Sequence, residues 1–95
     1  METKDAYIEK LNARIKELQA DLDKLDAKAR ESEADLKIKY QDEIEKLNVK
    51  KAKAETKLNE IRNASGEAWN DLKAGADQAF EDLKTSWKEA MAKFK

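Results

Sequence analysis

The chain has 95 residues, 43% of them charged, and its 20 lysines and arginines nearly balance 21 aspartates and glutamates to give a net charge of −1. It contains no Cys, His or Pro, which excludes disulfides and thiolate chemistry and leaves no base to activate a serine nucleophile. No basic patch is present to bind nucleic acid, and no apolar run is long enough to cross a bilayer. We therefore expect a non-enzymatic protein without catalytic, cofactor-binding or metal-ligating residues. Because the N-terminus lacks a secretory signal, we expect a cytoplasmic location.

The N-terminal segment carries an apolar stripe with coiled-coil spacing. Its large aliphatic residues are separated by three and four positions in turn, so they line one side of a helix. They are Ile8, Leu11, Ile15, Leu18, Leu22 and Leu25. We expect these side chains to form an interaction surface that packs on another helix.

The middle of the chain predicts a long helix followed by a turn. Residues 26–35 have a thin apolar stripe, but they contain no Gly, Pro or Asn, so helix propensity stays high and the helix is expected to continue through them. Asn63-Ala64-Ser65-Gly66 is the credible break. Asn and Gly tolerate the left-handed conformation that ends many helices, and Ser65 is a suitable cap for a following helix. Uninterrupted helix remains the alternative there.

The C-terminal segment has apolar residues at 3-4-4 spacing, which is an eleven-residue repeat and predicts a nearly straight amphipathic helix. The large residues of this stripe are Trp69, Leu72, Phe80, Leu83, Trp87, Met91 and Phe94. The small residue Ala76 completes the stripe between Leu72 and Phe80. One interpretation is that the stripe packs against protein. The other is that it lies on a membrane surface, although its balanced polar face lacks the lysine excess typical of such helices.

The predicted fold is all-α. It has a long charged helix over 1–63, a turn at 64–66 and an aromatic amphipathic helix over 67–95, arranged as an antiparallel helical hairpin or coiled coil. The second helix covers only half of the first, so we expect an oligomer, either a homodimer or a larger assembly. A three-helix bundle of segments 3–30, 33–62 and 66–94 is the first alternative, although no turn residue marks its first junction. One continuous coiled-coil helix is the second alternative.

Residues 68–84, Ala-Trp-Asn-Asp-Leu-Lys-Ala-Gly-Ala-Asp-Gln-Ala-Phe-Glu-Asp-Leu-Lys, resemble the C-terminal part of small bacterial coiled-coil proteins, some of which are labelled stress-response proteins. Those proteins also have a charged, Leu-rich N-terminal helix, so the resemblance covers most of the chain. The eleven-residue repeat is also similar to repeats of apolipoproteins and of late embryogenesis proteins. The resemblance implies a bacterial, cytosolic, non-enzymatic protein induced by stress.

Two functions are therefore expected as alternatives. The first is a structural or interaction protein that acts through helix–helix assembly with itself or with another helical protein. The second is a peripheral membrane or lipid-binding protein that uses the C-terminal amphipathic helix.

Overall fold

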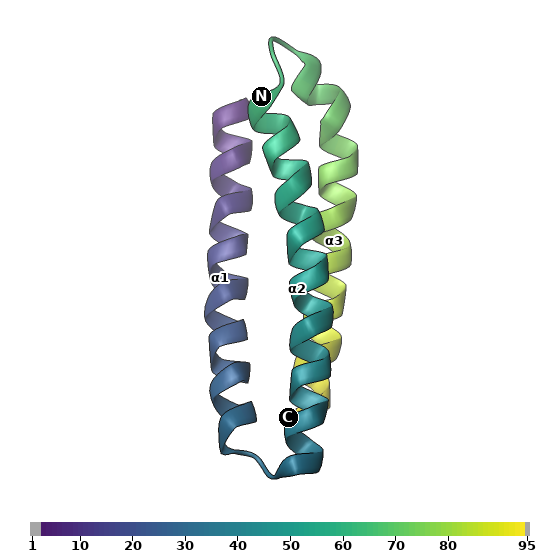
Figure 1. Ribbon diagram of the computed structural model, residues 1–95. Coiled ribbons are helices and arrows are strands. Elements are labelled where there is room, and N and C mark those ends of the chain that lie inside the picture. Colours follow the sequence, from purple (N-terminus) through teal and green to yellow (C-terminus); the bar gives the residue numbers. More distant parts are fainter. Residues whose placement is uncertain (1–2, 95) are drawn as a thin grey trace.

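The computed structural model describes residues 3–94, which form three α-helices joined by two short loops (Figure 1). Helix α1 spans Lys4–Glu31, α2 spans Ala34–Asn63 and α3 spans Ala68–Lys93. The helices alternate in direction and lie side by side in an elongated body of 52 × 19 × 17 Å. The described residues are thus all-α, as expected. The ends of the expected segments 1–63 and 67–95 include residues 1, 2 and 95, which lie outside the described residues.

The first loop divides the long helix expected from the sequence, so the single helix over 1–63 is in fact two helices. Ser32 (φ −89°, ψ 155°) and Glu33 (φ −68°, ψ 162°) are both extended. The hydroxyl of Ser32 donates to the carbonyl of Lys28 at 2.6 Å, and its N–H donates to the carbonyl of Ala29 at 3.2 Å. These bonds satisfy carbonyls that the end of α1 leaves free. The three helices are close in length, which agrees with the three-helix alternative.

The second loop lies between α2 and α3, at the position where the sequence predicts a turn. Gly66 has φ 59°, in the left-handed region that glycine adopts at little cost. Lys4 at the start of α1 reaches this end of the molecule, where its ammonium donates to the carbonyls of Arg62 (3.1 Å) and Ala64 (2.8 Å). A cation at the C-terminus of a helix is favoured by the helix dipole, so Lys4 stabilises the end of α2.

One apolar core runs along the three helices. Helix α3 lies closer to α2 than to α1. Small residues account for the close side, because Ala54 of α2 and Ala76 and Ala90 of α3 are completely buried. Large rings separate α3 from α1, since Trp69 contacts Tyr7 at 5.8 Å between ring centroids. The aromatic side chains of the eleven-residue stripe therefore keep α3 farther from α1 than from α2.

Candidate interaction surfaces

All the residues predicted to mediate helix contacts belong to the core of a single chain. Leu11, Leu18, Leu22, Leu25, Trp69, Phe80 and Leu83 are buried, and Ile8, Ile15, Leu72, Trp87, Met91 and Phe94 are partly buried against them. The N-terminal heptads are thus covered by α2 and α3 of the same molecule. Their burial needs no second chain, so an oligomer must rest on a different surface or on a rearrangement.

The α1–α3 contact near the N-terminus uses Tyr7, which the sequence pattern did not single out. Tyr7 is 1% exposed, and its hydroxyl donates to a carboxylate oxygen of Asp77 at 2.5 Å. The ammonium of Lys73 lies 5.2 Å from the centroid of the Tyr7 ring and 5.8 Å from that of Trp69, within the range of a cation–π contact. The ring fills the core while the hydroxyl is satisfied at its edge, so Tyr7 links α1 to the first half of α3.

The opposite end of α3 is fixed to α2 by Glu43, the one charged side chain that is buried among residues 3–94. Lys93 lies with its ammonium 2.5 Å from Glu43 Oε1, and the ammonium of Lys46 is 3.7 Å from the same atom. The hydrogen bond from Lys93 holds the pKa of Glu43 below its ordinary value despite the opposing effect of burial, and the same bond raises the pKa of Lys93. Tyr40 and Phe94 stack beside the pair with centroids 4.0 Å apart.

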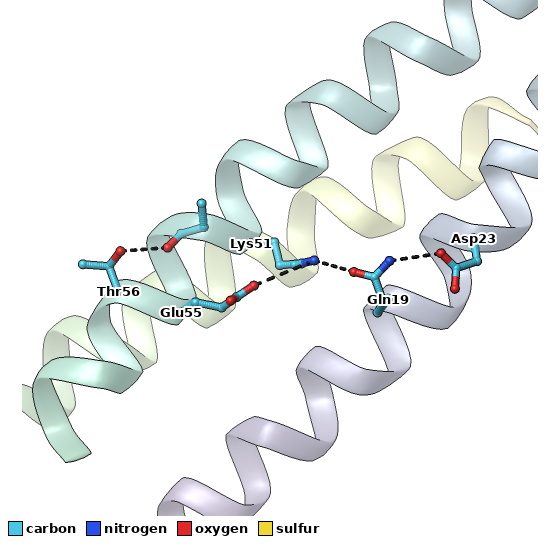
Figure 2. Close-up of polar contacts among 6 residues, drawn as sticks. Gln19, Asp23, Lys51, Glu55 and Thr56 are labelled. Atoms are coloured by element: carbon cyan, nitrogen blue, oxygen red, sulfur yellow. Dashed lines mark hydrogen bonds and ion pairs between the residues drawn. The ribbon is translucent and has the colours of Figure 1, made fainter.

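Helix α1 is tied to α2 mainly by the apolar core and by exposed polar contacts. Figure 2 shows Gln19 between Lys51 and Asp23: it accepts from Lys51 and donates to Asp23 at 3.0 Å. Lys51 also pairs with Glu55 of its own helix at 3.8 Å. The contact that joins the two helices in this network is the exposed hydrogen bond from Lys51 to Gln19. A hydrogen bond contributes about 0.5–1.5 kcal/mol, so it places α1 without strongly retaining it.

A cleft of about 160 Å³ separates α1 from α3 beyond the Tyr7 contact. Its lining residues are Arg14, Glu17 and Leu18 of α1 with Phe80, Leu83, Lys84 and Trp87 of α3. The indole N–H of Trp87 is buried without an acceptor among the described residues. Buried polar groups are normally paired, so this side of α1 is less completely packed than the side that faces α2.

The outward face of α2 exposes the most apolar surface. Ile38 is 57% exposed and Val49 is 52% exposed. They belong to a row of exposed residues at alternating steps of four and three, which places the row on the side of α2 opposite the core. We call this row the outer stripe, and it consists of Ile38, Asp42, Glu45, Val49, Ala52 and Thr56. Its acidic residues come before Val49, and the exposed Lys53 borders it after Val49.

Residues 3–94 hold no cluster of His, Cys, Asp or Glu arranged to bind a metal, and none of their helices is long and apolar enough to cross a membrane. No protein-family model, no curated protein and no solved structure matches the chain.

Proposed function

We propose that this chain is a non-enzymatic structural protein that acts through helix–helix assembly, and that the outer stripe of α2 is its docking surface for a second copy. The observation that carries the proposal is the order of charges around Val49. Glu45 lies four residues before it and Lys53 four residues after it, and all three side chains are exposed. This order makes the face complementary to itself in one orientation.

In an antiparallel pair of α2 helices with Val49 at the two-fold axis, Glu45 of each copy lies at the height of Lys53 in the other. A two-fold interface repeats each contact, so both opposite-charge pairs form together. In a parallel pair at the same register, Glu45 faces Glu45 and Lys53 faces Lys53. Charge complementarity therefore favours the antiparallel dimer and disfavours the parallel one.

The strength of this dimer is limited by its size. A contact confined to one helix of each copy is smaller than the roughly 1,600 Å² of a typical stable interface. Exposed charge pairs also contribute little affinity, although they strongly select orientation. We expect a weak dimer that forms at high protein concentration and low salt. A partner with a longer matching helix would bind the same face more tightly.

Sedimentation equilibrium with charge-exchange variants tests the proposal. Glu45→Lys alone and Lys53→Glu alone each place two like-charge pairs across the homodimer, so each variant should be monomeric where the wild type dimerises. An equimolar mixture of the two restores both opposite-charge pairs and should associate at least as well as the wild type.

The matched control moves the same charges to the exposed outer side of α1. Glu9→Lys and Lys16→Glu change the net charge equally without touching α2, and we expect both to dimerise like the wild type. A wild-type chain that stays monomeric at millimolar concentration would refute self-assembly. Association that the α2 variants leave unchanged would show that the outer stripe is not the docking surface.

A further inference from the structure

We infer that Ser32 and Glu33 form a hinge through which two copies of the chain exchange α1, with α1 and α2 of each copy joined into one continuous helix. The partner is a second copy of this chain, and the surface that it covers is the apolar face of α1. The exchange is a second route to helix–helix assembly, distinct from docking on the outer stripe, and it rests on the proposed function for its role.

The residues of the α1–α2 loop do not require a loop. Neither is Gly or Pro, and both have extended backbone angles that most residues adopt. The flanking segment 26–39 consists mainly of residues with good helix propensity. The other loop differs, because Gly66 there has φ 59°, a left-handed angle that a continuous α-helix does not contain. The α1–α2 loop is thus the one that can straighten.

The helix ends that meet at the hinge leave backbone groups without helical partners. Glu33 stands at the cap position of α2 and its side chain makes no capping hydrogen bond. The first N–H groups of a helix have no partner within it, nor do its last carbonyls. In a continuous helix, the N–H groups of residues 34–36 would donate to the carbonyls of residues 30–32, four positions earlier. Straightening therefore forms backbone hydrogen bonds, and the bond from the Ser32 hydroxyl to Lys28 is of the kind that Thr56 makes to Ala52 inside α2, so a helix can keep it.

The buried faces of α1 and α2 are in phase with each other. Core residues of α1 and α2 recur 36 residues apart, which is about ten turns of an α-helix. The pairs are Leu11 with Leu47, Leu18 with Ala54, Leu22 with Leu58, and Leu25 with Ile61. The residues through which α1 and α2 contact each other, such as Gln19 and Lys51, also fall on nearly one side of that helix (Figure 2). A straight α1–α2 helix thus presents one continuous face.

Two such helices can pack antiparallel without losing any type of core contact. Helix α1 of each copy then lies on α2 and α3 of the other copy. The contacts are those of the single chain, made between chains, and exchange of identical elements is a known low-cost route to dimers. The α1–α3 cleft and the exposed α1–α2 contacts leave α1 as the helix that separates most easily.

Variants at the hinge shift the equilibrium between the single-chain bundle and the exchanged dimer in opposite directions. Ala34→Pro is compatible with the loop, because Pro is favoured at the first position of a helix and Glu33 already has the extended conformation that precedes Pro. Inside a continuous helix the same residue is disfavoured about a hundredfold per chain. Ser32→Ala with Glu33→Ala raises helix propensity at both loop positions, so it favours exchange.

The experiment refolds each variant from urea at high protein concentration, in salt that suppresses contacts between exposed charges, and measures the dimer fraction by sedimentation. Cross-linking identifies the form of the dimer. The chain has no cysteine, so Gln19→Cys with Lys51→Cys introduces a single pair for a short bis-maleimide. We expect single-chain products from Ala34→Pro and two-chain products, with at least a tenfold larger dimer fraction, from the double alanine variant. Ser32→Gly is a second variant that should remain monomeric, and circular dichroism verifies folding.

Equal dimer fractions for Ala34→Pro, Ser32→Gly and the double alanine variant would overturn the inference, as would single-chain cross-links in every dimer. The outcome is separable from that of the proposed function. The charge-exchange variants on the outer stripe act on a face that hinge opening leaves unchanged. A response to those variants with no response to the hinge variants would remove the exchange and retain the proposed assembly.

Discussion

The cost of removing a core leucine should depend on whether the space beside it is closed. Leu47 of α2 and Leu18 of α1 are almost equally buried, at 1% and 2% exposure, so burial alone predicts equal losses on substitution by alanine. Leu18, however, lines the α1–α3 cleft of about 160 Å³. Leu-to-Ala changes in cores cost about 2–5 kcal/mol, and the spread reflects the cavity that is left behind.

We expect Leu47→Ala to lie near the upper end of that range, at about 4 kcal/mol, because the space it leaves is enclosed by the core. Leu18→Ala should lie near the lower end, at about 2–3 kcal/mol, because the new space joins an existing cleft that water reaches. A domain of this size has a total stability of about 5–14 kcal/mol, so both variants should still fold.

Urea unfolding monitored by far-UV circular dichroism measures both losses. The comparison is valid when the dependence of the unfolding free energy on urea is the same in all three proteins. Protein concentration must be low enough to keep each variant monomeric. Losses equal to within about 0.5 kcal/mol, or a greater loss for Leu18→Ala, would refute the reasoning that the α1–α3 side is less completely packed.

Three further predictions concern the two polar contacts that hold α3 in place and the two glycines of the chain. Tyr7→Phe keeps the ring and removes the hydroxyl that donates to Asp77, and thermal unfolding should show a loss of about 1–2 kcal/mol; no loss would mean that this bond does not help to fix α3. The pKa of Glu43 is lowered from 4.5 in the folded state, so its contribution is present above pH 4.5 and is lost as the pH falls through the folded pKa. The difference in Tm between wild type and Glu43→Gln should therefore shrink between neutral pH and pH 3, and a difference independent of pH would contradict the Lys93 pairing. Gly66→Ala places a side chain at φ 59° and should lower stability by about 1 kcal/mol, whereas Gly75→Ala inside α3, where a Cβ atom meets nothing within 4 Å, should raise it.

The sequence predicted the faces of the helices well, because apolar spacing records which side of a helix is buried. Every residue of the two predicted stripes lies in the core cluster. The register within a stripe was harder to predict: the hydrophobic pattern favoured Ile8, but Tyr7 is the more deeply buried of the two. Tyrosine occupies that position because its hydroxyl reaches Asp77, a residue 70 positions away that local periodicity cannot identify.

The two loops differ in how far the sequence could reveal them. Gly66 marks the second loop, because a positive φ requires a residue that tolerates it. Ser32 and Glu33 carry no such mark, since their extended angles are open to any residue. The first loop forms when the stripes of α1 and α2 cover each other within one chain. Local propensity favours the straight helix and intrachain packing favours the turn. In the exchange that we infer, the balance between the two forms depends on protein concentration.

The exchange that we infer also defines what the aromatic helix contributes. Helix α3 packs closely on α2 and follows a loop in which Gly66 has a positive φ, so the inferred exchange leaves α3 with α2 of its own chain. Its stripe faces inward, and contact with a membrane through that stripe would require the core to open. Trp69, Phe80 and Leu83 instead lie in the core, and in the exchange that we infer they cover the α1 of a second copy. The cleft between α1 and α3 leaves one side of the bundle less closely packed, and for this reason we infer that α1 is the helix that exchanges.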